Sequence, residues 1–245
     1  MQIHDFFYKL FSIDRRTDVP AYLGTAFSIV PGGGLLTCRH VVDIGSEACD
    51  KVIAVLDNKT KVLQEISQIM YPSQPELDLA FLPNALESNK KEYFPILNPP
   101  RLTIGEEVYS FGFYAFGGQH ERLVQGYFSG RIVNIYQDTD KLKAHIVVLP
   151  YPVIEGMSGS PVLTYHNGPK VVGICYKNQQ QRIVASEVLE YKDTVREYKE
   201  TVNRVVEFGL AYHSDCITDF LNSISVTGFL VSEKWEEIPG LAEIQ

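Results

Sequence analysis

The sequence predicts an all-β protein of the sandwich or barrel type, and three observations support this fold class. Short apolar and β-branched runs recur along most of the chain, with Gly-containing turns between them. The composition includes 18 Gly and 13 Pro, which favour turns, and 14 Tyr and 13 Phe, which favour strands. Hydrophobic residues make up 45% of the chain, which is ordinary for a globular protein, and its 245 residues are enough for two packed barrels.

The expected strands follow one another with regular turns. Residues 19–38 carry no charge, but the PGGG turn at residues 31–34 indicates two strands and not a membrane span. The polar stretch at residues 82–102 indicates a surface connection, so we expect domains at residues 1–102 and 103–245. The expected strands are residues 22–30, 35–37, 52–56, 62–70, 77–82, 107–113, 123–136, 145–149, 162–165, 171–176 and 207–212.

Two segments depart from this strand pattern. Residues 186–205 are highly charged, and five of them recur at spacings of three and four, the period of a helix. These five are Val188, Tyr191, Val195, Tyr198 and Val202. We therefore expect a helical insertion at residues 186–205. A short C-terminal helix is expected at residues 216–223, with Ser214 or Asp215 as its cap.

Charge and the N-terminal sequence exclude several classes of partner. The net charge is −8 and no Lys/Arg cluster occurs, so neither nucleic acid nor an anionic membrane surface is an expected partner. Asp5 and Lys9 interrupt the apolar run near the N-terminus, which does not fit a secretory signal peptide. We expect a soluble, cytoplasmic protein.

The cysteines do not form a recognisable metal motif. Cys38, Cys49, Cys175 and Cys216 contain no CxxC pair, so a zinc site is not expected. In a reducing compartment they are expected to be free and mostly buried thiols. No metal and no cofactor is predicted.

Three short motifs contain residues suited to nucleophilic catalysis. TCRHVV at residues 37–42 contains His40, and ELDLAFL at residues 76–82 contains Asp78. GMSGSPV at residues 156–162 contains Ser158. The order is His, Asp, Ser, with each motif in or beside an expected strand. Each motif alone is a weak signal, but their order in a strand-rich chain of this size predicts a catalytic triad.

The proposed chemistry explains why these residue types are needed. A serine hydroxyl needs an adjacent base, and His40 can accept its proton and later donate it to the leaving amine. Asp78 would hold the imidazole in one tautomer and stabilise the imidazolium. Glycines on both sides of Ser158 allow a tight loop that points backbone amides at the developing oxyanion. The expected donors are the N–H groups of Gly156 and Ser158.

With these motifs in place, the chain resembles the trypsin-like peptidases, and most of all the protease domain of the HtrA-type enzymes. The resemblance covers residues 22–222 and includes LGTAF at residues 23–27, GEEVYSFGFY at 105–114, VVGICY at 171–176 and FGLAYHSDCITDFL at 208–221. It implies a chymotrypsin-like fold of two packed six-stranded antiparallel barrels, with the triad in the cleft between them. It also implies a peptide or protein substrate.

Three departures from the family pattern qualify this resemblance. Met157 occupies the position at which zymogen trypsins place an Asp that binds a newly cut N-terminus, so activation of that kind is not expected. Ser160 replaces the more usual second glycine, as in the glutamyl endopeptidases. No PDZ-like domain is expected after the matching region. The insertion at residues 186–205 falls where this fold borders the substrate pocket, so it is either a plain surface helix or a lid or regulator-docking element.

The resemblance places Val153, Ile154, Tyr176 and Lys177 at the primary substrate pocket. No Asp occupies the trypsin-like position there, so a preference for Lys or Arg is not supported. A small or medium apolar residue before the scissile bond is expected, while Lys177 would instead favour an acidic one if it reaches the pocket rim.

The leading interpretation is a regulated intracellular serine endopeptidase that a protein activator could switch on. The alternatives are a catalytically silent protease-fold binding module, which intact triad residues argue against, and an esterase with the same triad. Phe6, Phe7, Tyr8 and Phe11 could drive formation of a homo-oligomer, or could form a helix that packs on its own barrel.

Overall fold

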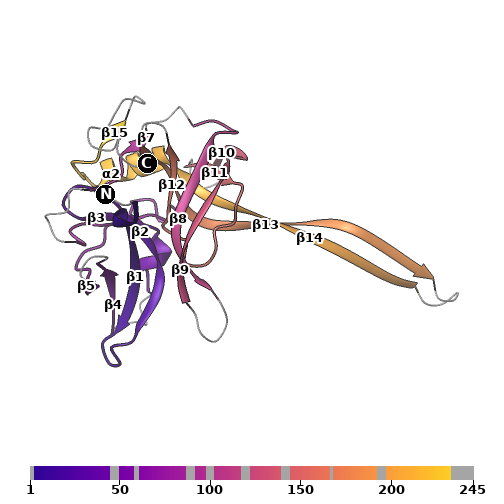
Figure 1. Ribbon diagram of the computed structural model, residues 1–245, viewed down its shortest axis with the longest axis horizontal. Coiled ribbons are helices and arrows are strands. Elements are labelled where there is room, and N and C mark those ends of the chain that lie inside the picture. Colours follow the sequence, from indigo (N-terminus) through magenta and orange to yellow (C-terminus); the bar gives the residue numbers. More distant parts are fainter. Residues whose placement is uncertain are drawn as a thin grey trace.

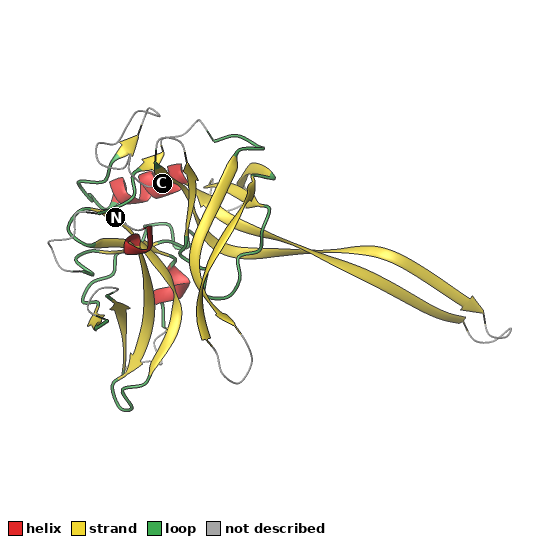
Figure 2. Ribbon diagram, viewed as in Figure 1, coloured by secondary structure: helices red, strands yellow, loops and turns green. Residues whose placement is uncertain are grey.

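Two antiparallel sheets form most of the structure, which is a computed structural model. It describes residues 3–44, 50–57, 61–86, 92–97, 102–116, 122–138, 144–165, 168–191 and 197–232. The all-β fold class is confirmed, with two curled sheets side by side and few helices (Figures 1 and 2). No helix among the described residues has the length and apolar character needed to cross a membrane.

The first sheet has six strands in the order β5-β4-β1-β2-β3-β6. Its strands are β1 (Phe7–Asp14), β2 (Pro20–Val30), β3 (Gly34–Thr37), β4 (Lys51–Leu56), β5 (Leu63–Glu65) and β6 (Ala80–Leu82). The second half of β2 is buried and mostly apolar, apart from Thr25 and Ser28, and β3 is buried throughout, as expected for strands that face a core. His40 lies shortly after β3 of this sheet, and Asp78 lies shortly before β6.

The second sheet is larger than expected, with nine strands where six were predicted. The main path is β10-β11-β14-β13-β12-β8-β9, and β7 joins it through parallel pairing with β13 and β15. Its strands are β7 (Ile96–Leu97), β8 (Glu107–Phe116), β9 (Arg122–Arg131), β10 (Asn134–Asp138), β11 (Ala144–Leu149), β12 (Pro161–Tyr165), β13 (Pro169–Tyr191), β14 (Glu197–His213) and β15 (Val231–Ser232). Ser158 lies in the loop that leads into β12.

The predicted helical insertion at residues 186–205 is wrong. Residues up to Tyr191 continue β13, residues from Glu197 belong to β14, and the pairs run from Ser186↔Val202 to Tyr191↔Glu197. Val, Tyr and Thr fit a pleated strand better than a helix, and cross-strand pairing outweighs the apparent helical spacing. The two strands leave the body as a long hairpin (Figure 1). Val195, which also contributed to the helical pattern, lies outside the described residues.

Three short helices complete the described chain. They are η1 (Ile3–Phe6), α1 (Arg39–Val42) and α2 (Ser214–Ser223). The cap of α2 is His213 and neither Ser214 nor Asp215, because the His213 ring accepts a hydrogen bond from the Asp215 backbone N–H at 3.3 Å. An imidazole nitrogen can serve here because it accepts in the same way as the usual hydroxyl or carboxylate oxygen.

The N-terminal aromatics lie in the protein's own core. Phe6, Phe7 and Tyr8 are buried, and Phe7 begins a strand instead of lying in a helix. The Phe7 ring lies 5.5 Å from that of Phe111 in the second sheet, measured between centroids. These three buried side chains therefore help to join the two sheets and are not available for self-association.

Candidate active site

His40 is held at the end of the first sheet by the single turn α1. Cys38, the residue before this turn, is extended, and Val41 and Val42 point into the core. These buried neighbours fix the turn, while 48% of the His40 side chain is exposed. The His40 imidazole is therefore accessible to solvent, while the backbone that carries it is held in place.

Asp78 contacts His40 through both of its carboxylate oxygens. The His40 backbone N–H donates to Oδ1 at 2.8 Å, and the His40 ring Nδ1 lies 2.5 Å from Oδ2. A carboxylate only accepts hydrogen bonds, so Nδ1 carries a proton and Nε2 of the neutral ring is the free base. The two motifs that lie 38 residues apart in the sequence are thus in contact.

The second sheet also supports Asp78. The Asp78 backbone N–H donates to the Tyr212 hydroxyl at 3.3 Å, and the Tyr212 ring stacks on Tyr176 with a centroid separation of 4.1 Å. Burial raises the pKa of both phenols well above the usual range, so both hydroxyls stay neutral. Tyr212 therefore fixes the Asp78 segment across the junction of the two sheets.

The loop that carries Ser158 begins with a tight turn. Met157 N–H donates to the Ile154 carbonyl at 2.9 Å, and Gly156 between them has a φ of +93°. A positive φ at the third position of a hydrogen-bonded four-residue turn is typical of type II, which favours Gly there. Met157 is fully buried in the core of the second sheet, so its side chain anchors the loop.

Gly159 is the second position in this loop that only glycine can fill. Its φ is +85°, and an added Cβ would lie 2.0 Å from the Thr25 carbonyl oxygen and 2.4 Å from Thr37 Oγ1. Real Cβ atoms do not approach that closely, so any side chain would displace the loop from β2. The glycines predicted from the motif are therefore needed for both backbone conformation and close packing.

Two side chains of β2, Tyr22 and Thr25, hold the Ser158 loop from behind, and we call them the β2 clamp. The Gly156 carbonyl accepts from Tyr22 Oη at 2.8 Å and from Thr25 Oγ1 at 3.0 Å. The Ser158 carbonyl accepts from the Thr25 backbone N–H at 3.0 Å. Burial raises the pKa of Tyr22 well above its usual range, so its hydroxyl remains a donor. Neither residue was predicted from the sequence as part of the site.

Two amides of this loop are unpaired while its carbonyls are held. Within the described part of the chain, neither the Gly156 nor the Ser158 backbone N–H donates a hydrogen bond, whereas the N–H groups of Met157, Gly159 and Ser160 do. Such amides, held by their neighbours but unpaired themselves, fit the role of oxyanion donors. These are the two groups that the motif predicted.

Ser158 lies beside the helix that carries His40. An added Cβ on Gly24 would touch Val41 at 2.9 Å and the Ser158 carbonyl oxygen at 3.1 Å, so Gly24 is in contact with both segments. Among the described residues no hydrogen bond joins the Ser158 hydroxyl to His40. Catalytic hydrogen bonds are often long before substrate binds, so the geometry is compatible with a base that engages the hydroxyl in the complex.

An open groove runs from His40 and Asp78 along the start of the long hairpin. Tyr176 and Lys177, two residues predicted for the substrate pocket, line this groove. Two acidic residues that were not predicted to line it, Glu76 and Asp138, line it as well. The other two predicted residues lie elsewhere: Val153 is buried in the core of the second sheet, and Ile154 packs against that core.

The region around His40 and Asp78 also brings together atoms that could in principle hold a metal. Ligand atoms of Cys38, His40 and Asp78 lie within 4.8 Å of one another. Burial raises the pKa of the Cys38 thiol well above its usual value, and the thiol donates to the Cys175 carbonyl at 3.2 Å. A protonated thiol is a poor ligand, and Asp78 is already bonded to His40, so this set does not fit a metal.

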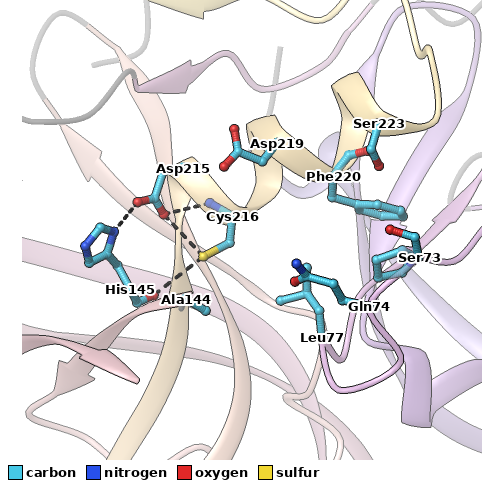
Figure 3. A pocket seen from close by; sticks show the side chains of 11 residues that line it. Ser73, Gln74, Leu77, Ala144, His145, Asp215, Cys216, Asp219, Phe220 and Ser223 are labelled. Atoms are coloured by element: carbon cyan, nitrogen blue, oxygen red, sulfur yellow. Dashed lines mark hydrogen bonds and ion pairs between the residues drawn. The ribbon is translucent and has the colours of Figure 1, made fainter. Parts of the chain in front are cut away.

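A second His–Asp pair lies beside a pocket of about 360 Å³ between α2 and the segment before Asp78 (Figure 3). His145 Nδ1 is hydrogen-bonded to Asp215 Oδ2, and His213 Nδ1 lies 3.1 Å from Asp215 Oδ1. Burial opposes charge on Asp215, but its contacts with His213 and His145 outweigh it and place its pKa below the usual range. Burial, with the nearby Asp215 charge, raises the pKa of Cys216 instead, so this thiol is not a thiolate.

Comparisons with known proteins agree with this geometry. The family model of the trypsin-like peptidase domain matches residues 24–174. A search of curated proteins found no significant match. Among solved structures, the active form of the Rv3671c protease from M. tuberculosis is 18% identical with a TM-score of 0.58, covering 94% of this chain and 86% of that one.

A second similar structure is the HtrA-type protease AlgW in complex with a decapeptide. It is 16% identical with a TM-score of 0.60, and the match covers 90% of this chain and 64% of the AlgW chain. The chain thus spans a little under two thirds of AlgW. At this level of identity both structures support the fold, and the resemblance expected from the motifs is confirmed.

Proposed function

Because the chain belongs to the trypsin-like peptidase family, we propose that it is a serine endopeptidase in which His40, Asp78 and Ser158 form the triad. The observation that carries this assignment is the pair of hydrogen bonds from His40 to the two oxygens of Asp78. This contact leaves the other ring nitrogen available as a base, which is what a serine nucleophile requires.

In the acylation step, His40 Nε2 removes the proton from Ser158 Oγ as this oxygen attacks the carbonyl carbon of the scissile bond. The carbonyl oxygen becomes an oxyanion that accepts hydrogen bonds from the N–H groups of Gly156 and Ser158. The C–N bond then breaks, and the imidazolium donates its proton to the leaving amine. The acyl group remains as an ester on Ser158.

Deacylation repeats these steps with water as the nucleophile. His40 Nε2 takes a proton from the water, the hydroxide adds to the ester carbonyl, and the same two N–H groups stabilise the oxyanion. The C–O bond to Ser158 breaks and Ser158 Oγ regains a proton from His40, which releases the carboxylic acid. Asp78 stays ionised throughout and stabilises the imidazolium in both halves.

The buried side chain of Met157 supports a mode of control that differs from that of zymogen trypsins. A newly cut N-terminal ammonium would need a buried carboxylate partner, and the fully buried Met157 in the apolar core offers none. Control by a protein activator and a cytoplasmic location stay predictions.

Labelling with a fluorophosphonate probe tests the proposal directly. We expect the purified wild-type protein to be labelled, and Ser158→Ala and His40→Ala to lose labelling while remaining folded by circular dichroism. Cleavage of an unfolded protein substrate should be lost in the same two variants, which separates a peptidase from an esterase. A folded wild-type protein that is not labelled, alone or in cell lysate, would support the binding-module alternative.

A further inference from the structure

The long hairpin leaves the body with no strand on either outer edge. Strand β12 pairs with β13 only as far as Ile174, and β11 pairs with β14 only from Gly209 onward. Beyond these points β13 and β14 pair with each other alone within the described residues. We call this two-stranded part, residues 176–191 and 197–208, the arm (Figures 1 and 2).

A two-stranded ribbon of this length is not expected to be stable by itself in water. An isolated hairpin is at best marginally stable, because it has no core of its own. The arm exposes Ile183, Val184 and Val205 at 48%, 59% and 50%. Its free edges present unpaired N–H and C=O groups, which form a ready template for another strand. The arm therefore has the features of a surface that is completed by an extended polypeptide.

The inner end of the arm is part of the catalytic groove. Five consecutive residues of β13, from Tyr176 to Gln180, line the groove that contains His40 and Asp78. Hydrogen bonds from Asn178 and Gln180 to Glu207 hold the two strands together at this point. A polypeptide that occupies the groove therefore has the open edge of β13 directly in its path.

Charge separates the arm from the rest of the molecule. The arm contains four Lys or Arg and five Asp or Glu, so nearly all of the net charge of −8 belongs to the rest of the chain. On β13, residues 179–184 contain a single charged residue, Arg182, so charge contributes little to the choice of occupant at this edge. Pairing through the backbone is also largely independent of side chains, which suits an enzyme that meets segments of varied sequence.

We propose that the outer edge of β13 from Gln179 to Val184 binds an extended segment of the protein substrate as an added strand. This inference rests on the proposed peptidase function. The edge begins beyond Tyr176 and Lys177 of the substrate pocket and is about 17 Å long at the rise of an extended strand, so the bound segment lies outside the residues that flank the scissile bond. The arm thereby favours unfolded substrates with a long extended flank over short peptides.

Two shortened arms provide the test and its matched control. In the armless variant, Asn-Gly replaces residues 181–206 and joins Gln180 to its register partner Glu207. In the tip-shortened variant, Asn-Gly replaces residues 188–200 and joins Glu187 to its partner Thr201, which keeps the proposed edge. Asn-Gly is the preferred two-residue turn of a hairpin, so both variants retain a closed ladder.

The measurement compares a short and a long peptide that share one cleavage site. The site is first mapped by mass spectrometry on reduced, carboxymethylated ribonuclease A. Peptides of about eight and about 20 residues are then made, the longer one extended on either side so that it can span the edge. For the wild type and the tip-shortened variant we expect a kcat/KM at least about tenfold higher for one long peptide than for the short one. For the armless variant we expect this ratio to fall to about one, with unchanged cleavage of the short peptide.

Labelling by the fluorophosphonate probe separates this inference from the proposed function. If the wild type is neither labelled nor active, the function itself is wrong. If labelling is normal but the armless variant keeps the preference for the long peptide, the docking inference is wrong. An armless variant that loses labelling would also overturn it, because the arm would then act on the catalytic centre. A wild-type dimer that light scattering shows to become monomeric in the armless variant would overturn it as well, because a second copy would then be the occupant.

Discussion

The β2 clamp gives the most informative single perturbation of the candidate site. The Gly156 carbonyl held by Tyr22 and Thr25 belongs to the one peptide unit that lies between the two expected oxyanion donors, the N–H groups of Gly156 and Ser158. Fixing this unit restricts both neighbouring peptides. Removing the two hydroxyls with Tyr22→Phe and Thr25→Val preserves the shapes of the side chains but frees the carbonyl.

The contacts of the β2 clamp allow the losses of unfolding free energy and of kcat in these variants to be estimated. Thr25 Oγ1 also accepts from the Phe113 backbone N–H at 3.1 Å, so Thr25→Val leaves a buried donor unpaired and lowers the free energy of unfolding by about 1–3 kcal/mol. In the double variant the Glu155–Gly156 peptide can rotate and remove one oxyanion donor. The loss of one such donor lowers kcat by about 100- to 1000-fold, with little change in KM because the oxyanion exists only in the transition state.

The assay measures kcat and KM on a short peptide together with unfolding by urea. Thr25→Ser keeps the hydroxyl, so this variant should retain most of the wild-type kcat and serves as the matched control. A double variant that is folded and has a kcat within about twofold of the wild type would refute the reasoning, because the loop would then hold its shape without the clamp.

Two further predictions follow from the loop and from the second His–Asp pair. Gly159→Ala should abolish labelling of Ser158 and lower the melting temperature, since its Cβ would lie 2.0 Å from the Thr25 carbonyl oxygen; a labelled, fully stable variant would contradict this. The folded-state pKa of Asp215 lies below the ordinary value of 3.8, so its contribution to stability is complete above that pH and is lost as the pH falls through the folded pKa. The difference in unfolding free energy between the wild type and Asp215→Asn should therefore be constant near neutral pH and shrink below about pH 4, and a difference that does not change with pH would count against it.

The parts of the site that the sequence predicted are those with local signals. The motif around His40, the segment with Asp78 and the glycines around Ser158 each have a recognisable spacing, and the structure places the first two in contact. The role of Tyr22 has no such signal. Its partner Gly156 lies 134 residues away, so only the packing of the two sheets brings them together.

The arm shows why periodicity alone was misleading. In a segment rich in charged residues, apolar residues can fall at spacings of three and four by coincidence. The β-branched and aromatic content of the segment favoured a strand, and the pairing from Ser186↔Val202 onward decides the structure. The error was in weighting period above residue type.

The two His–Asp pairs of this fold show what a catalytic centre requires beyond the pair itself. Both join a ring Nδ1 to a carboxylate, and the histidine side chains are exposed to a similar degree, 48% for His40 and 46% for His145. The surroundings differ. The helix that carries His40 and the Ser158 loop both contact Gly24, and the Gly156 and Ser158 N–H groups of this loop are unpaired among the described residues. By contrast, Cys216 beside Asp215 is kept protonated by burial and contacts the carboxylate. The second pair instead ties β11 to α2. A base becomes catalytic only where a nucleophile and unpaired donors are held beside it, and among the described residues that combination is found at Ser158.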